Sequence, residues 1–531
     1  MSDEKANGSN TVAPYEQSLD SRTLREGEAN VSRGESSGEG TSPESQPSGQ
    51  VHRTKDNEKD AEKGGSDNWD EDPRNPRLWQ GCRKWAAAAI VSLYTLVSPL
   101  ASSMMAPGLL EIAHAFGITN STVAALTLSI FVLAYAIGPL FITPLSESKY
   151  SFVLLYLRVI TYFELSVYGR SWPLHLSNLF FLIFNLVTAW APNTASLIVF
   201  RFLAGIGGSA PLTIGAGSIA DLFHERDRAV AMSLFSLGPL LGPIIGPIAG
   251  GFITQDIGYK WVFIIISIAA GTIALFGITL LQETYAPVLR RRYGYPDLAP
   301  RGSLGEVLTE NLIRPLQLLT RSLICFSLSL YMAIIYGLLY LMFVTFPTLF
   351  ANVYGWGPGI AGLAYLGLGV GFMFAAVIGS RLMNVLYLKL SERNGGQGKP
   401  EYRIPPMLGG TMLIVIGLLW YGWTAHVKAH YILPIIGSGV FGAGMMFCFM
   451  PIQLYLVDSF TYAASAIAAA TFLRSLFGFA FPLFGQQLFA ALGIGGGHSL
   501  LAGIAIVVGV PFPIWIYFKG EEMRARNPLN R

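Results

Sequence analysis

The chain has 531 residues, of which 52% are hydrophobic and only 13% carry a charge, and its mean hydropathy is +0.46. Soluble domains have about 25% charged residues, so this composition excludes an ordinary soluble protein and indicates a membrane protein. The net charge of +3 is too small, and the basic residues are too scattered, to indicate a nucleic-acid partner.

The beginning of the chain differs from the rest. Residues 1 to about 80 are rich in Ser, Gly, Glu, Asp, Lys and Arg, with few large apolar side chains. Such a stretch buries too little apolar surface to offset the entropy of ordering it, so we expect residues 1–82 to form a disordered cytoplasmic tail. It lacks the basic segment and apolar core of a signal peptide. Its end, residues 69–79, mixes Trp and Arg as segments at a membrane surface do.

Twelve apolar segments follow, each close to the roughly 20 residues that cross a bilayer. The first six are predicted near 84–106, 122–143, 173–191, 194–220, 228–253 and 260–282. The other six are predicted near 323–350, 359–382, 406–425, 432–457, 464–491 and 498–518. We therefore expect an all-α membrane protein with a six-helix bundle at 83–282, a cytoplasmic central loop at 283–320, a second bundle at 321–518 and a cytoplasmic tail at 519–531.

Positive charges predict the orientation. With the N-terminus in the cytoplasm, the inside loops and tail hold nearly all of the loop Lys and Arg residues, and the outside loops hold little beyond Lys260 and Lys428. Positive residues favour the cytoplasmic side, so both termini are predicted inside. Asn120-Ser121-Thr122 is a glycosylation sequon on an outside loop. Because it directly adjoins a span, we expect little modification of Asn120.

The fifth predicted span carries a regular pattern of small and ring residues. Glycine recurs every four residues, which places the glycines on one helix face, and prolines form an adjacent stripe. The residues are Gly238, Pro239, Gly242, Pro243, Gly246, Pro247 and Gly250. Two interpretations are open, since close structural packing and a pivot where two bundle halves slide need the same surface.

This pattern resembles the antiporter motif of the major facilitator superfamily. Arg201-Phe202-Leu203-Ala204-Gly205 resembles a second motif of that superfamily, and Glu283-Thr284-Tyr285-Ala286-Pro287 resembles its fungal drug:proton antiporter group with twelve spans. Residues 455–458, 463–466 and 474–475 resemble the same group, and the likeness runs from about 69 to 520. The resemblance implies two bundles related by a pseudo-two-fold axis. It also implies a monomer in the plasma membrane, powered by the proton gradient without a cofactor, that exports drugs, toxins or secondary metabolites.

Charged residues in and beside the spans are the first candidates for function. A guanidinium within a span is costly and normally faces the bundle interior. Arg201 is therefore either a structural clamp on backbone carbonyls or a charge that senses substrate or proton, and the resemblance implies the second role. By the same resemblance, Glu147, Arg170 and Asp221 are cytoplasmic gate charges, with Asp458 and Arg474 as counterparts in the second half. The alternative is that these charged residues only form a solvent-exposed helix face and have no gating role.

Sparse polar and aromatic residues mark a candidate cavity. They are Asn185, Tyr331, Tyr336, Tyr340, Gln453, Tyr455, Gln486 and Gln487. A tyrosine stripe can equally serve packing, but an aromatic pocket with few charges suits bulky, weakly polar cargo. No carboxylate lies at mid-depth in a predicted span, which argues against strongly cationic cargo.

The sequence contains no phosphate-binding loop, no metal-spaced His/Cys/Glu cluster and no nucleophile elbow, so we expect neither an enzyme nor an ATP-driven pump. We expect small molecules, protons and lipid as partners. A proton-coupled nutrient importer and a transport-dead receptor on the same fold are the alternatives to an exporter.

One segment interrupts the family pattern. Residues 144–147 and 168–170 match a short turn between the second and third spans, yet residues 148–167 intervene. The insert is apolar but too short to span, with Arg158 in its middle. It is either a re-entrant or interfacial segment or a retained intron. Ser148-Lys149-Tyr150 and Ser166-Val167 can encode splice donor and acceptor signals, and excision would join residue 147 through an isoleucine to Tyr168.

Overall fold

The computed structural model describes residues 69–147, 169–295, 304–460 and 462–526. The side chains at 141–147, 225–226, 229 and 304–311 are outside this description. The insert predicted at 148–167 and the tail up to residue 68 also lie outside the described residues.

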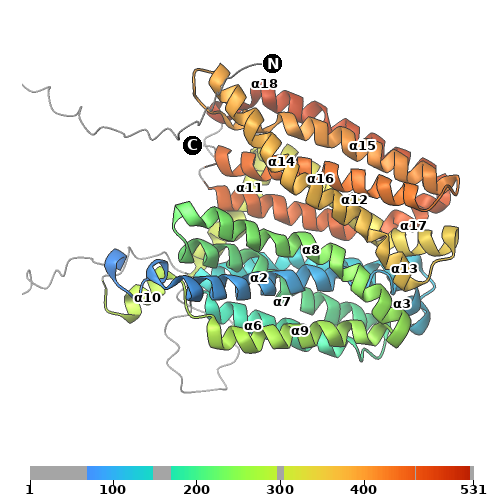
Figure 1. Ribbon diagram of the computed structural model, residues 1–531, viewed down its shortest axis with the longest axis horizontal. Coiled ribbons are helices and arrows are strands. Elements are labelled where there is room, and N and C mark those ends of the chain that lie inside the picture. The colour runs from blue at the N-terminus through green and yellow to red at the C-terminus, as the bar shows by residue number, and fades with distance from the viewer. Residues whose placement is uncertain (1–68, 148–168, 296–303, 461, 527–531) are drawn as a thin grey trace, which may run out of the picture. The chain divides into compact units, whose positions relative to one another are not determined.

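The described residues form helices joined by loops (Figure 1). The first half contains the 3-10 turns η1 (Trp69–Glu71) and η2 (Pro76–Leu78), then α2 (Gly81–Ser103), α3 (Leu109–Ala115), α4 (Ser121–Glu147), α6 (Ser171–Thr188), α7 (Thr194–Leu222), α8 (Glu225–Ile257) and α9 (Tyr259–Leu280). Between the halves lie α10 (Ala286–Arg292) and α11 (Leu304–Arg321). The second half contains α12 (Leu323–Tyr354), α13 (Pro358–Leu363), α14 (Tyr365–Arg393), η3 (Pro400–Arg403), α15 (Pro405–His426), α16 (Ile432–Ser459), α17 (Ala463–Gly509) and α18 (Pro511–Arg526).

The described helices account for the twelve predicted spans. Ten helical segments are long and apolar enough to span a bilayer, the last of them running from 463 to 526. This last segment is two spans, because Gly493 has a φ of 70° and reverses the chain there. The ring of His498 stacks on Phe489, with centroids 4.7 Å apart, which a straight helix would not allow for residues nine positions apart. The 18 residues of α6 provide the remaining crossing.

The helices form two bundles, which confirms the predicted all-α membrane fold. In one bundle α2, α4, α6, α7, α8 and α9 pack together, and in the other α12 and α14 to α17 do so. Figure 1 shows the blue-to-green helices on one side and the yellow-to-red helices on the other. We call the end with the connections at 104–120, 189–193, 258 and 355–357 the distal end, and the end with those at 223–224, 281–285 and 460 the proximal end.

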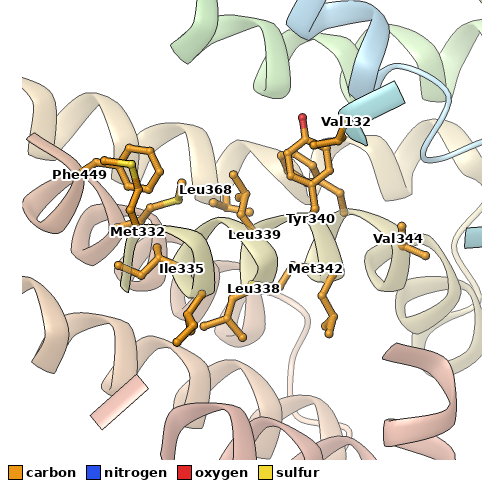
Figure 2. Close-up of a cluster of buried hydrophobic side chains, with 14 of the residues drawn as sticks. Val132, Met332, Ile335, Leu338, Leu339, Tyr340, Met342, Val344, Leu368 and Phe449 are labelled. Atoms are coloured by element: carbon orange, nitrogen blue, oxygen red, sulfur yellow. The ribbon is translucent and has the colours of Figure 1, made fainter. Parts of the chain in front are cut away.

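Helix α12 lies deepest in the second bundle. It is apolar on all faces, as expected of a helix surrounded by other helices. Figure 2 shows Tyr340 of α12 near Val132 of α4, and Met332 near Phe449 of α16. The core therefore extends from the second bundle to the first.

The expectation that the disordered tail extends to residue 82 is wrong for its last part. Residues 69–79 fold against the segment that follows α9: the rings of Trp69 and Tyr295 meet edge to face, with centroids 5.4 Å apart. The Tyr295 hydroxyl donates to Asp72 at 2.7 Å, and the amide of Arg74 donates to the same carboxylate at 2.8 Å. These hydrogen bonds lower the pKa of Asp72 to about 2. The segment is ordered because residues distant in sequence pack against its aromatic side chain and donate hydrogen bonds to its acidic one.

Candidate functional site

Arg201 lies in α7 and is completely buried. Its Nη1 donates to the carbonyl of Ala101 at 3.1 Å, and its Nε donates to the carbonyl of Thr127 at 3.4 Å. Ala101 is near the end of α2, where the last carbonyls of a helix lack partners within it. The guanidinium also lies 4.7 Å from the ring centroid of Phe131. The geometry is that of the clamp, while Arg201 Nη2 has no hydrogen-bond partner among the described residues.

A second arginine lies where the two bundles meet. Arg474 is half-buried in α17, with its guanidinium 5.0 Å from the ring centroid of Tyr336 and 5.9 Å from that of Phe449. The rings of Tyr336 and Tyr340 are 5.0 Å apart. The Tyr340 hydroxyl is 3.1 Å from Ser102 Oγ of α2, a hydrogen bond between the bundles. We call Arg474, Tyr336, Tyr340 and Phe449 the seam cluster.

The structure places other predicted cavity residues inside single bundles. Asn185 donates to the carbonyl of Phe263 at 2.9 Å and to Ser267 Oγ at 3.0 Å, so it joins α6 to α9. Tyr331 is hydrogen-bonded to Thr411 Oγ1 at 2.7 Å within the second bundle. Tyr455 is buried near the proximal end, where its hydroxyl donates to Glu401 at 3.3 Å. The structure does not bring these three residues together, because each finds its partner within its own bundle.

The three predicted glutamines are also apart. Gln453 is exposed on α16. Gln486 donates to Thr348 Oγ1 at 3.4 Å inside the second bundle. Gln487 crosses to the first bundle, where its amide lies 2.5 Å from Thr122 Oγ1 at the distal end. Thr122 belongs to the sequon, and the side chain of Asn120 accepts a hydrogen bond from its amide at 2.8 Å.

The first predicted gate is assembled at the proximal end. Arg170 Nε lies 3.3 Å from Asp221 Oδ2, and the Arg170 guanidinium lies 5.0 Å from the ring centroid of Tyr285. Gly217 makes room for this arrangement, since a Cβ there would lie 1.6 Å from Arg170 Nη1. Glu147 is the last residue of α4, and its side chain is outside the described part of the chain.

The second gate pairs different residues from those predicted. Asp458 forms an ion pair with Arg403, at 2.5 Å, and not with Arg474. Arg474 lies eleven residues after the first residue of α17. At 1.5 Å per residue it is about 16 Å from the proximal end of that helix, too deep to be a proximal gate charge. Arg403 precedes the ninth span as Arg170 precedes the third, so matching the two halves position by position would have found it.

Two further ion pairs near the proximal end were not predicted. Arg524 holds Glu401 with two hydrogen bonds, of 3.0 and 2.9 Å, and the Glu401 side chain is buried. Lys399 lies 2.7 Å from Glu521, and this pairing lowers the pKa of Glu521 and raises that of Lys399. They connect η3, which precedes α15, to the second half of α18.

The glycine stripe of α8 packs within its own bundle. Gly238, Gly242, Gly246 and Gly250 all face α2. A Cβ at Gly246 would lie 2.9 Å from the Leu100 carbonyl oxygen, and one at Gly250 would lie 1.8 Å from that of Met104. The prolines Pro239, Pro243 and Pro247 lie inside the same helix without ending it.

Another face of α8 makes the contact between the bundles. A Cβ at Gly251 would lie 2.4 Å from the Pro358 carbonyl oxygen, and one at Gly362 would lie 2.6 Å from that of Pro247. The Gln255 side chain accepts a hydrogen bond from the amide of Gly359 at 3.0 Å. These contacts, like that between Gln487 and Thr122, lie at the distal end. A surface that could slide between the bundles is therefore formed by Pro247 and Gly251 rather than by the stripe.

Farther from the distal end, α8 and α14 border an open cleft of about 540 Å³. All of its lining residues are apolar, and they include Leu241, Ile244, Gly369, Met373 and Val377. Among the described residues, no group of three or more His, Cys, Asp or Glu side chains is placed to hold a metal ion.

The sequence matches the Major Facilitator Superfamily over residues 91–482. It is similar to the MFS-type transporter penM of Penicillium rubens, with 42% identity over 86% of this chain and 89% of that protein. It is also similar to the efflux pump radE of Floropilus chiversii, at 39% identity over 86% and 84% of the two chains, and to the efflux pump vrtL of Penicillium aethiopicum, at 41% over 86% and 90%.

Among solved structures, the fold is similar to the xylose transporter XylE from E. coli in a partially occluded inward-open conformation. The TM-score is 0.57 and the identity 15%, over 82% of this chain and 98% of that one. The curated relatives are named as transporters and efflux pumps, which confirms the prediction that the chain is not an enzyme.

Proposed function

Since the chain belongs to the Major Facilitator Superfamily, we propose that it is a proton-coupled antiporter that exports bulky, weakly polar organic molecules by alternating access. The main support for export is the similarity, at about 40% identity over most of both chains, to proteins named as efflux pumps. Drugs, toxins and secondary metabolites are the cargo class, by similarity to these relatives and by the aromatic character of the seam cluster.

The geometry supports alternating access between two bundles. The bundles contact each other at the distal end through Gly251, Gly362 and Gln487, where backbones approach closely. At the proximal end, the pairs Arg170–Asp221 and Arg403–Asp458 each join helices of one bundle. Each bundle is thus tied internally and can move as a unit about the distal contacts.

We place the protein in the plasma membrane as a monomer, with both termini, and hence the proximal end, in the cytoplasm. The proximal loops carry most of the positive charge, and such loops favour the cytoplasmic side. The proton gradient supplies the energy without a cofactor.

A strain lacking the protein and a strain overproducing it test the direction of transport. Both are exposed to a panel of lipophilic toxins, sugars and inorganic ions, and intracellular cargo is measured. Export lowers intracellular cargo on overproduction, import raises it, and a receptor changes neither. Protection against sugars or ions alone would refute the cargo class.

The energy source is tested in the same cells. A protonophore should stop efflux, and depletion of ATP at a maintained proton gradient should not. Efflux that survives the protonophore but stops when ATP is depleted would refute proton coupling. Arg201→Ala should abolish efflux while the protein still reaches the membrane, and Arg381→Gln, at an exposed position on α14, should leave it intact.

A further inference from the structure

The position of Arg474 is unusual for a charged side chain. It lies about 16 Å along α17, which places it inside a hydrocarbon layer of about 30 Å rather than at the helix end. One turn later, a Cβ at Gly478 would lie 2.8 Å from the Tyr336 ring and 3.1 Å from Val132 of the other bundle. Residues four apart share a helix face, so Arg474 faces the seam between the bundles.

Arg474 lacks the partners that the neighbouring arginines have. Arg170 and Arg403 pair with aspartates, and Arg201 donates to two carbonyls. Among the described residues, the guanidinium of Arg474 lies over the rings of Tyr336 and Phe449, and its Nε is buried without a hydrogen-bond partner. A guanidinium in such a place normally meets an anion or a set of carbonyls, because desolvating it alone is unfavourable.

The surroundings of Arg474 are positive. In the described spans, Asp and Glu occur only near helix ends, as Asp221, Asp256 and Asp458 do, whereas Arg201 and Arg474 lie within the membrane. A cation entering the seam would meet like charge at low dielectric, while an anion would meet a counter-ion.

We propose that Arg474 is the counter-ion of an acidic group on the cargo, so that the protein recognises organic anions with an aromatic or apolar body. A carboxylate or an ionised enol would accept hydrogen bonds from the guanidinium, and the planar fork of arginine suits two oxygen acceptors. The body of the cargo would lie against Tyr336, Phe449 and Tyr340. The inference rests on the proposed function and narrows its cargo class.

The test compares two probes with the same aromatic body and chain length, 1-pyrenebutyrate, which ends in a carboxylate, and 1-pyrenebutanol, which ends in a neutral hydroxyl group. Binding to the full chain in phosphatidylcholine nanodiscs is measured by equilibrium dialysis at neutral pH, where the carboxyl group is ionised. Empty nanodiscs give the partition of each probe into lipid. We expect the wild type to bind the acid about tenfold more tightly than the alcohol, as a charge-assisted hydrogen bond provides.

Arg474→Gln should remove this preference by weakening the binding of the acid and leaving that of the alcohol unchanged. Arg474→Lys should keep part of it, and Arg381→Gln should keep all of it. Equal binding of acid and alcohol by the wild type, absence of acid binding, or an unchanged preference in folded Arg474→Gln would overturn the proposal. The wild-type comparison holds even if the glutamine variant fails to fold.

The result of the binding test can be distinguished from the results of the transport assays. A preference for the acid without proton-driven export would keep the anion site and refute the proposed function. Proton-driven export of neutral cargo, with no preference for the acid, would keep the function and refute the anion site.

Discussion

Glu283 accepts two hydrogen bonds from Ser171, one from its amide at 3.1 Å and one from its hydroxyl at 2.8 Å, across 112 residues of sequence. The same carboxylate accepts a hydrogen bond from the amide of Arg170 at 2.9 Å. A residue that follows the sixth span thereby caps the first turn of α6, whose amides have no partners within the helix.

Glu283→Ala should therefore destabilise the first bundle by about 1–3 kcal/mol, since it leaves buried amides unsatisfied. Thermal unfolding of the purified protein in detergent measures the change. Glu392→Ala, at an exposed position near the end of α14, is the matched control and should unfold like the wild type. Equal unfolding temperatures for the two variants would show that the cap contributes nothing.

Replacing glycines of the α8 stripe should destabilise the contact with α2. Gly246→Leu and Gly250→Ala place atoms where backbone oxygens already lie, which costs about 1–3 kcal/mol or more. Gly409→Ala is the control, because no atom lies within 4 Å of a Cβ built there, and it should be neutral or stabilising. The midpoint of thermal unfolding measures the effect. If Gly246→Leu unfolds at the same midpoint as the wild type, the predicted destabilisation of the contact between α8 and α2 is wrong.

The docking of residues 69–79 should persist to low pH. The folded pKa of Asp72, about 2, is below its ordinary value of 3.8, so its contribution to stability is complete above about pH 4 and is lost as the pH falls toward 2. Tyr295→Phe removes the largest cause of the shift and should raise the pKa of Asp72. Carboxyl ¹³C NMR, with Asp72→Asn to assign the resonance, measures both values. An unchanged pKa in Tyr295→Phe would show that Tyr295 has no part in it.

The Arg403–Asp458 pair should contribute more than an exposed pair. Its side chains are 17% and 29% exposed, against 61% and 47% for Lys519 and Glu522. A double-mutant cycle with Arg403→Ala and Asp458→Asn should give a coupling of about 1 kcal/mol, and the cycle on Lys519 and Glu522 a few tenths at most. Equal couplings in the two cycles would mean that burial does not strengthen the proximal pair.

The insert at 148–167 should be absent from the working protein. Excising 57 bases removes 19 residues from the 531 and leaves 512, with an isoleucine between Glu147 and Tyr168. Sequencing cDNA across the junction tests this, and the flanking exon sequence is its internal control. A dominant transcript that retains all 57 bases would establish the segment as a genuine part of the protein.

Most spans could be predicted because hydropathy and length indicate them, but the partners within the site could not. Which residues meet depends on how each helix is rotated about its own axis. The sequence of a helix that is apolar on all faces, such as α12, gives little information about that rotation. Tyr336 and Tyr340 share a face because they are four residues apart. Tyr331, five residues before Tyr336, is rotated by about 140° from it and faces its own bundle.

Arg474 illustrates the same limit. Its sequence position indicated a functional charge, but whether it would meet Asp458 or Tyr336 depended on its depth in α17. The roles of the polar residues of the candidate cavity were equally ambiguous in the sequence. A side-chain amide such as that of Asn185 can form a hydrogen bond with a neighbouring helix as readily as with a ligand.

The reversal at Gly493 has a consequence for how the chain is made. No polar loop separates the last two spans, and a Cβ at Gly497 would lie 2.5 Å from the Phe489 ring, so the two helices pack from the turn onward. The insertion machinery has no hydrophilic segment here to translocate. We expect the two helices to enter the bilayer as one hairpin, because each supplies contacts to the other beside the turn, as Phe489 and His498 do.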